Sequence, residues 1–142
     1  MNILVVDDEL GLRHTLTLIL QSEGHTVRAA SEGASGLELL GQSPADLIIC
    51  DVRMPGLDGL AFLEKYKELG GTALVIMMSA YGDDEAALEA IRRGAYDFIP
   101  KPFRADQVLL VVRKAIEREG LRRRHYLRPD GYADAILMAL QV

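Results

Sequence analysis

The most constraining feature of the sequence is a regular alternation between short apolar runs and longer segments with helical spacing. The apolar runs are rich in β-branched residues or leucine. Five of them are predicted as strands: Asn2–Val6, His25–Ala30, Asp46–Cys50, Ala73–Met78 and Tyr96–Ile99. Strands that alternate with helices form a parallel sheet covered on both faces, and strands buried on both sides read as continuous apolar runs. The sequence therefore predicts an α/β fold with five strands and five helices.

The segments between the apolar runs carry the signals of helices. Residues 83–93 begin with acidic side chains and end with basic ones, which suits the helix dipole, and Gly94 can take the left-handed conformation that ends a helix. The last helix should begin near residue 104 and reach about residue 120. One buried face is predicted for the first helix and one for the last, formed by Leu12, Leu16, Ile19 and Leu20, and by Val108, Val111, Val112 and Ala115.

Composition limits the class of protein. The chain has 142 residues, 49% of them hydrophobic, which suits one domain with a substantial core. No apolar run approaches the length of a membrane span, and the N-terminus resembles no secretion signal. Cys50 is the single cysteine and lies in an apolar run, so we expect a core residue rather than a disulfide or a metal ligand. A cytoplasmic protein is expected.

Charge is distributed unevenly along the chain. Residues 1–112 carry nine Lys and Arg against seventeen Asp and Glu, whereas residues 113–142 carry seven against four. The densest basic stretch is "LRRRH" at 121–125, and we expect the last helix to continue into it. Such a run is usually a solvated helix face or a linker, so no direct nucleic-acid binding by this chain and no membrane contact are expected.

Polar side chains follow the predicted strands. Asp7 and Asp8 follow the first strand, Asp51 the third, Ser79 the fourth and Lys101 the fifth. The carboxyl ends of parallel strands meet at one edge of the sheet, which is where functional groups gather in open α/β folds. We therefore expect three carboxylates, a hydroxyl and an ammonium group to converge there.

Three carboxylates in one place require positive charge. Two of them about 4 Å apart repel by roughly 4 kcal/mol at a surface-like effective dielectric constant. Lys101 supplies one positive charge, and a hard divalent cation such as Mg²⁺, which prefers oxygen ligands and phosphate, would supply the rest. A carboxylate beside that ion can attack phosphorus, while the hydroxyl and the ammonium suit the phosphoryl oxygens. The pattern predicts magnesium-dependent phosphoryl chemistry.

The sequence resembles the receiver domain of two-component response regulators over about residues 2–118. The matching motifs are "VVDDE" at 5–9, "DVRMPGLDG" at 51–59, "MSAYG" at 78–82 and "GAYDFIPKPF" at 94–103. The last three look most like the receivers of enhancer-binding transcriptional activators of the nitrogen-regulation type. The resemblance implies a flavodoxin-like (βα)5 sandwich with strand order 2-1-3-4-5, which acts as a phosphorylation switch rather than as an enzyme.

The resemblance also implies the roles of the acidic residues. Asp51 matches the aspartate that accepts a phosphoryl group from a sensor histidine kinase. Asp7 and Asp8 match the acidic pair that holds Mg²⁺ together with the acceptor, and the backbone carbonyl of Arg53 would be a further ligand. Asp58, in contrast, is expected only to cap the helix that follows it.

Further positions match the switch of the family. Ser79 matches the hydroxyl residue that meets the phosphoryl group, and Lys101 the lysine that pairs with it. Phe98 falls on the switch aromatic, although phenylalanine has no hydroxyl and would report packing only. The family has a cis peptide bond before the residue that corresponds to Pro102. His14 lies on the first helix, which receivers of this family often present to their kinase.

Other readings of the same residues remain. An Asp after a strand is often only a helix cap, and this would hold for Asp8 or Asp51 taken singly. A magnesium-dependent phosphatase with an aspartate nucleophile would also place carboxylates here, but that class resembles Asp-x-Asp followed closely by Thr, whereas no Thr precedes Thr15. A flavin-binding module would need donors for phosphate after the first strand, where the acidic loop repels phosphate.

The end of the chain lies beyond the resemblance. We expect a receiver domain at 1–120 and a C-terminal extension or linker at 121–142. "RPDG" at 128–131 should form a turn. One apolar helix face is then predicted for Ala133, Ile136, Leu137 and Leu140. Such a stripe must be buried on its own domain or on another chain, and a homodimer contact through residues 121–142 is our prediction.

Overall fold

The computed structural model describes residues 1–80 and 82–126 and contains a five-stranded parallel sheet of order β2-β1-β3-β4-β5. The strands are β1 (Asn2–Val6), β2 (Thr26–Ala30), β3 (Leu47–Asp51), β4 (Leu74–Ala80) and β5 (Asp97–Lys101). The helices are α1 (Leu10–Ser22), α2 (Gly33–Gln42), α3 (Gly59–Glu68), α4 (Asp84–Arg92) and α5 (Ala105–Tyr126). The predicted flavodoxin-like fold and strand order are confirmed.

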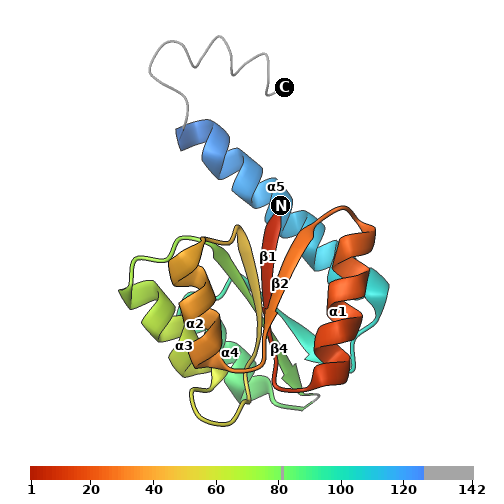
Figure 1. The fold of residues 1–142 in the computed structure, drawn as a ribbon, viewed down its shortest axis with the longest axis vertical. Helices are drawn as coiled ribbons and strands as arrows, with labels where there is room; N and C mark the ends of the chain where they lie inside the picture. Colours follow the sequence, from red (N-terminus) through yellow and green to blue (C-terminus); the bar gives the residue numbers. More distant parts are fainter. Residues whose placement is uncertain (81, 127–142) are drawn as a thin grey trace.

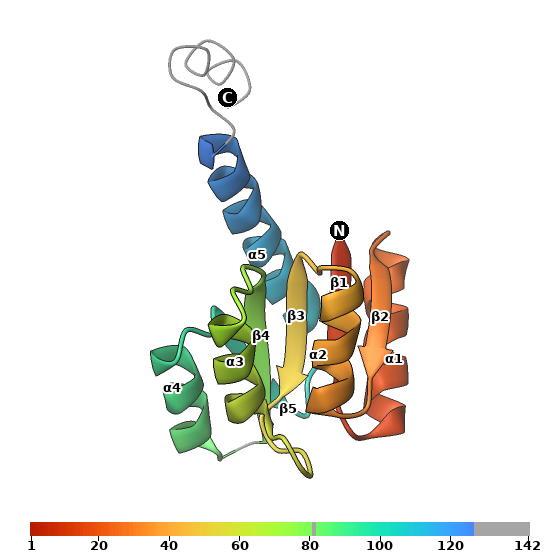
Figure 2. The same cartoon turned by 60° about the vertical axis from the view of Figure 1, so that its left-hand side comes forward.

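The helices form two layers around the sheet. Helices α1 and α5 cover one face, and α2, α3 and α4 cover the other (Figures 1 and 2). The central strand β1 contributes to both cores: Ile3 and Val5 pack with α1 and α5, whereas Leu4 and Val6 pack on the side of α3 and α4. All four side chains have no exposed surface, and burying each contributes about 1.5–3 kcal/mol. This two-sided burial explains the continuous apolar runs.

Three strands extend further than their apolar runs. Asp51 is the last residue of β3, Ser79 lies inside β4, and β5 ends with Lys101, whereas we predicted these residues beyond the strand ends. Backbone pairing causes the difference, because Asp51 still pairs with Met78 and Ala80 still pairs with Lys101. A polar side chain ends an apolar run without ending the hydrogen-bonded ladder. At the other end, β2 begins at Thr26, one residue later than predicted.

The helix boundaries agree with their sequence signals. Asp58 caps α3, because its carboxylate accepts a hydrogen bond from the Ala61 amide at 2.9 Å. Gly94 follows α4 with a φ of 108°, as predicted for a left-handed stop. The predicted inner faces of α1 and α5 are confirmed in their central parts by the full burial of Leu16, Leu20, Val108 and Ala115.

Helix α5 continues through the basic stretch to Tyr126, as predicted, and projects beyond the end of the sheet (Figure 2). The predicted turn at 128–131 and the apolar stripe at 133–140 lie outside the described residues. Within residues 1–80 and 82–126, none of the helices combines the length and hydrophobicity that crossing a membrane requires.

Gly59 allows α3 to begin directly against the end of β3. A Cβ atom at this position would lie 2.2 Å from the Asp51 carbonyl oxygen, 2.7 Å from the Val52 Cα and 2.7 Å from the Met77 Cε. Two of these neighbours are backbone atoms, which cannot move aside without shifting β3. Because Gly59 has no side chain, the start of α3 can pack directly against the backbone of Asp51 and hold it in place.

We expect Gly59→Ala to destabilise the protein by about 1–3 kcal/mol, the range for overpacking a filled core. Gly41→Ala is the matched control, because a Cβ atom there meets nothing within 4 Å and Ala is the better helix former by about 0.5–1 kcal/mol. Urea unfolding at equilibrium measures both. Equal stability of the Gly59→Ala variant and the native protein would show that the end of β3 is not tightly held.

Candidate functional site

The carboxyl ends of the strands bring the predicted polar residues to one edge of the sheet. Asp7 and Asp8 follow β1 directly, and the neighbouring β3 ends with Asp51. On the other side of β3, β4 carries Ser79, and β5 carries Lys101 at the edge of the sheet. Residues that are up to 94 positions apart in the sequence thus share one site.

The three carboxylates form a compact all-oxygen group. One oxygen from each of Asp7, Asp8 and Asp51 lies within 4.8 Å of the others. Asp7 and Asp51 are buried, whereas Asp8 is exposed at the mouth of the site. Hard oxygen donors open to water on one side are what Mg²⁺ prefers, since it retains several water ligands. The residues therefore fit a magnesium ion.

Lys101 joins the two buried carboxylates. Its Nζ lies 2.9 Å from Oδ2 of Asp51 and 3.2 Å from Oδ2 of Asp7, and it donates a hydrogen bond to each. Burial alone would lower the pKa of Lys101, but the hydrogen bond and charge of Asp51 and the charge of Asp7 outweigh it, so this pKa lies above its ordinary value. Lys101 is therefore charged at neutral pH.

Asp51 carries a carboxylate that the protein only partly stabilises. Burial raises its pKa above the ordinary value, and the charge of Asp7 acts in the same direction. The hydrogen bond and charge of Lys101 oppose the rise, as does the Arg53 amide, which donates to Oδ1 of Asp51 at 3.3 Å. A cation beside this carboxylate would stabilise its ionised form, because the hydrogen bonds and the charge of Lys101 do not fully offset the cost of burying its charge. The carboxylate is also the group at this edge best placed to act as a nucleophile.

The two predicted switch residues occupy different environments. Ser79 is buried, with 3% of its surface exposed, in the strand next to Asp51. Phe98 is 39% exposed and lies apart from the carboxylates, at a hollow of about 250 Å³ beside α4 that Leu88 and Ile91 also line. The peptide bond between Lys101 and Pro102 is cis, as the resemblance implied.

Sequence reasoning missed two contacts at this edge. The Arg13 guanidinium, on α1, donates a hydrogen bond at 2.8 Å to the backbone carbonyl of Asp7. The Arg53 side chain, considered only for its carbonyl, forms a two-pronged ion pair with Asp83. No local pattern distinguishes these arginines from other surface arginines, because their partners become neighbours only in the fold.

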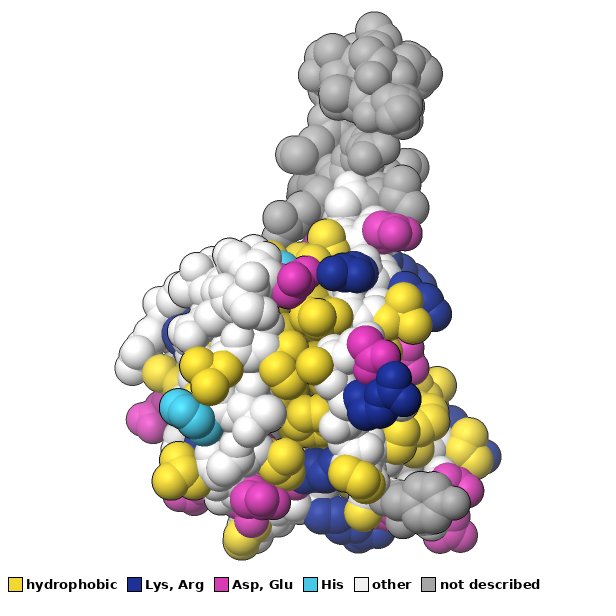
Figure 3. Space-filling model, turned by 90° about the vertical axis from the view of Figure 1, so that its right-hand side faces the viewer, with side chains coloured by type: hydrophobic (Ala, Val, Ile, Leu, Met, Phe, Trp, Pro, Cys, Tyr) yellow, Lys and Arg dark blue, Asp and Glu magenta, His cyan; other side chains and the backbone are white. Residues whose placement is uncertain are grey.

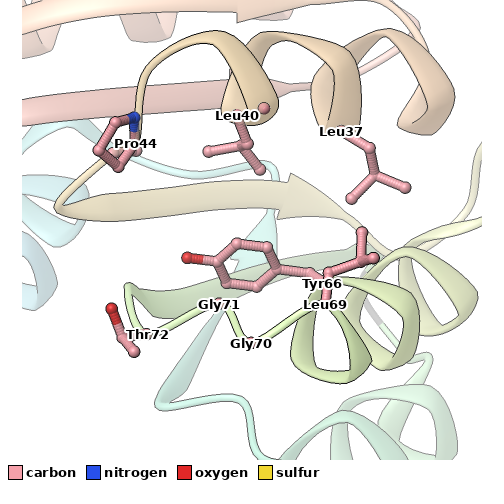
Figure 4. A pocket seen from close by; sticks show the side chains of 10 residues that line it. Leu37, Leu40, Pro44, Tyr66, Leu69, Gly70, Gly71 and Thr72 are labelled. Carbon is pink, nitrogen blue, oxygen red and sulfur yellow. The ribbon is translucent and has the colours of Figure 1, made fainter.

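A second hollow lies at the opposite edge of the sheet, between the ends of α2 and α3 (Figure 4). It has a volume of about 240 Å³, and its walls include Leu37, Leu40 and Leu69. The Tyr66 ring also lines it, but its hydroxyl accepts a hydrogen bond from the Ala73 amide at 2.9 Å and is thus occupied. None of its lining residues is an acid, a base or a cation. The chemistry therefore belongs to the carboxylate edge.

The sequence profile of the response regulator receiver domain matches residues 3–113. The DNA-binding transcriptional regulator NtrC of Escherichia coli (strain K12) is 40% identical over 112 residues, which cover 79% of this chain and 24% of that protein. The nitrogen assimilation regulatory protein NtrX of Azorhizobium caulinodans is 39% identical over 124 residues, which cover 86% and 27%. The chain thus spans about a quarter of the length of these curated relatives.

A solved structure shares the fold at similar identity. The crystal structure of the receiver domain of NtrX from Brucella abortus superimposes with a TM-score of 0.78 at 44% identity, covering 81% of this chain and 98% of that chain. The sequence and structure comparisons therefore agree with the chemistry that the cluster of Asp7, Asp8 and Asp51 indicates.

We expect Asp51→Asn to raise the unfolding temperature at pH 7. The pKa of Asp51 is raised in the folded state, so its ionised form is less favourable there than in the unfolded chain, and the neutral amide removes that cost. Below about pH 3, where the carboxyl group is protonated in both states, the difference should vanish. Thermal unfolding followed by circular dichroism in EDTA at both pH values measures this. A lower unfolding temperature at pH 7 would mean that the lost bond to Lys101 outweighs the relieved cost of burying the Asp51 charge.

Proposed function

This chain belongs to the response regulator receiver domain family, and from that premise we propose that Asp51 accepts a phosphoryl group from the phosphohistidine of a sensor histidine kinase. The observation that carries the proposal is the buried carboxylate of Asp51, bound to Lys101 and adjacent to Asp7 and Asp8 at the carboxyl edge of the sheet. A receiver domain is a phosphoacceptor switch rather than an enzyme with turnover on an external substrate.

The transfer exchanges one bond to phosphorus for another. A carboxylate oxygen of Asp51 attacks phosphorus, an O–P bond forms, and the N–P bond of phosphohistidine breaks with its electron pair left on the imidazole nitrogen. The ammonium of Lys101, 2.9 Å from Oδ2 of Asp51, is placed to meet a phosphoryl oxygen. The product is an acyl phosphate on Asp51.

We assign the metal site to the side chains of Asp7, Asp8 and Asp51 and to the backbone carbonyl of Arg53. Support comes from the distances among the three carboxylates and from their oxygen-only chemistry. Mg²⁺ bound there would neutralise the carboxylates and the negative charge of the incoming phosphoryl group. The protein provides two buried ligands, Asp7 and Asp51, and one exposed ligand, Asp8.

The proposed switch couples the acceptor to the surface of α4 and β5. The phosphoryl group adds negative charge and new acceptor oxygens, to which Ser79 and Lys101 respond by moving. The hollow beside α4 exposes apolar surface and is lined by Leu88, Ile91 and Phe98. Repacking of Phe98 against α4 would alter this surface and hence its contacts with a partner.

The proposed docking face for the kinase is α1. Figure 3 shows the side of the molecule that carries α1, with a band of hydrophobic side chains down the middle of that face. Leu10 and Leu18 on this helix are 69% and 54% exposed, and His14 is exposed between them. An exposed helix with apolar side chains beside the acceptor edge suits a helical partner that must bring its phosphohistidine to Asp51.

The wider role rests on the relatives, whose names describe transcriptional regulators. We propose that this chain controls transcription in the cytoplasm through an output domain or a partner, without touching nucleic acid itself. Division into a receiver at 1–120 and an extension at 121–142 remains our prediction, as does pairing of two copies through that extension.

The alternative activity is a magnesium-dependent phosphatase with an aspartate nucleophile. The same carboxylates would serve it, but it would release inorganic phosphate repeatedly from simple phosphate esters. A receiver instead takes up one phosphoryl group per chain. Release of phosphate from p-nitrophenyl phosphate over many turnovers would favour the phosphatase.

With Mg²⁺ and acetyl phosphate, we expect one phosphoryl group per chain, detected by intact-mass spectrometry as a single addition. Asp51→Asn should abolish the addition, because the amide is no nucleophile. Asp58→Asn is the control: it retains the cap of α3 and should be labelled like the native protein. Full labelling of the Asp51→Asn variant would assign the acceptor to another residue.

A second pair of variants separates the metal site from the switch. Asp8→Ala should weaken Mg²⁺ binding about tenfold or more, since it removes one ligand, and phosphorylation should fall with it. Ser79→Ala should leave Mg²⁺ affinity within about twofold while blunting the structural response to beryllium fluoride, because its hydroxyl meets only the phosphoryl group. Calorimetry and NMR chemical shifts measure the two effects. Loss of Mg²⁺ binding in Ser79→Ala would contradict this division of roles.

A further inference from the structure

An exposed ion pair connects the two loops that flank the acceptor. The Arg53 Nε lies 2.9 Å from Oδ2 of Asp83, and its terminal nitrogen lies 3.2 Å from Oδ1. This parallel arrangement is the strongest geometry for arginine and a carboxylate. The hydrogen bond and charge of Arg53 hold the pKa of Asp83 below its ordinary value. The pair is therefore formed at neutral pH.

Arg53 and Asp83 lie in the two segments whose movements the proposed switch couples: the loop after Asp51 and the segment before α4. The backbone amide of Arg53 donates to Oδ1 of Asp51, so its position is tied to the acceptor carboxylate. Asp83 directly precedes α4 and follows Ser79 by four residues. The ion pair thus connects the loop of the acceptor with the segment between Ser79 and α4, across 30 residues of sequence.

We propose that the Arg53–Asp83 ion pair is a latch that holds the start of α4 in its unphosphorylated position and sets how readily the domain switches. The inference rests on the proposed function, because it concerns the movement that phosphorylation of Asp51 causes. Arg53 and Asp83 are positioning residues in it. Neither side chain touches the reacting atoms.

Two physical reasons make the pair specific to the unphosphorylated state. Movement of Ser79 towards the phosphoryl group shifts the segment that carries Asp83, and a two-pronged ion pair tolerates little displacement. The phosphoryl group also places about two negative charges near Arg53 and competes with Asp83 for its guanidinium group. Both effects weaken the latch when Asp51 is modified.

The latch acts as a fine control. The Arg53 side chain is 71% exposed and that of Asp83 18%, so water and salt screen their attraction. Exposed ion pairs of this kind shift an equilibrium by roughly 1.5- to 5-fold. A shift of that size changes the fraction of switched molecules without locking the domain in either state.

The test compares backbone amide chemical shifts of β4, α4 and β5 in the native chain and its variants. Native spectra without and with saturating beryllium fluoride and Mg²⁺ define the two end points. Without beryllium fluoride, Arg53→Ala and Asp83→Asn should each move these resonances towards the switched end point, raising the ratio of switched to unswitched molecules about 1.5- to 5-fold. The Asp83 side chain makes no capping hydrogen bond to α4, and Asn is an equally good N-cap residue, so the effect of Asp83→Asn reports lost charge rather than a frayed helix.

The double variant Arg53→Ala/Asp83→Asn decides between a pair and two separate effects. The resonances of the double variant should have the same positions as those of the single variants. Two independent effects would instead multiply the ratios of switched to unswitched molecules. Arg53→Lys, which keeps the charge, should lie between the native protein and Arg53→Ala. The matched control is Arg113→Ala, which breaks the Arg113–Glu23 pair between α5 and α1, also exposed and with a distance of 3.0 Å. It should not move the resonances.

Two outcomes would overturn the latch: single variants that leave the resonances at their native positions, or effects that multiply in the double variant. A failure of the proposed function looks different. In that case the native protein itself would show no second end point with beryllium fluoride and Mg²⁺.

Discussion

The bonds from the Lys101 ammonium to Asp7 and Asp51 are the interaction on which the site depends. They connect β1, β3 and β5 at their carboxyl ends, at distances of 3.2 and 2.9 Å. Without this cation, the two buried carboxylates would each keep only one backbone amide donor, and removing one partner of a buried ion pair typically costs about 3–5 kcal/mol. One ammonium group nevertheless leaves three carboxylates with a net negative charge. The remaining negative charge suits the metal ion and the phosphoryl chemistry that we propose for this site.

The acceptor is held firmly on one side and loosely on the other. On the side of the core, Gly59 packs against the backbone carbonyl of Asp51, and the neighbouring residues Cys50 and Val52 are buried. On the solvent side, the segment after Ser79 is held to the loop that follows Asp51 by the exposed Arg53–Asp83 ion pair. Burial is far stronger than an exposed ion pair. We therefore expect a perturbation at Asp51 to move the segment that leads to α4 more than it moves the core.

The fold was predictable because its signal is local. The central strands β1, β3 and β4 are buried on both faces, as Ile3 and Leu4 illustrate, so their apolar runs stand out without knowledge of their neighbours. The place where a strand ends is not local in this sense. Asp51 and Lys101 belong to their strands because of backbone pairing with β4, which no property of their own side chains reveals.

The same distinction applies to the site. Asp7, Asp8 and Asp51 could be brought together in advance, because parallel strands deliver their carboxyl ends to one edge. The Arg13 contact with Asp7 and the Arg53 contact with Asp83 could not, since a long side chain can reach in several directions and its partner depends on loop conformation. The sequence therefore predicts groups placed at strand ends and does not reveal contacts made by long side chains such as Arg13 and Arg53.

The length of α5 has a mechanical consequence. With 22 residues, this helix is about 33 Å long, and Figures 1 and 2 show its far end extending clear of the sheet. The helix is buried in the core as far as Ala115, and residues 116–126 form an arm of about 16 Å, so a tilt of about 5° displaces its end by about 1.4 Å. A small tilt of α5 near β5 would thus move the backbone of Tyr126 by more than about 1 Å, because the length of the free arm enlarges the movement.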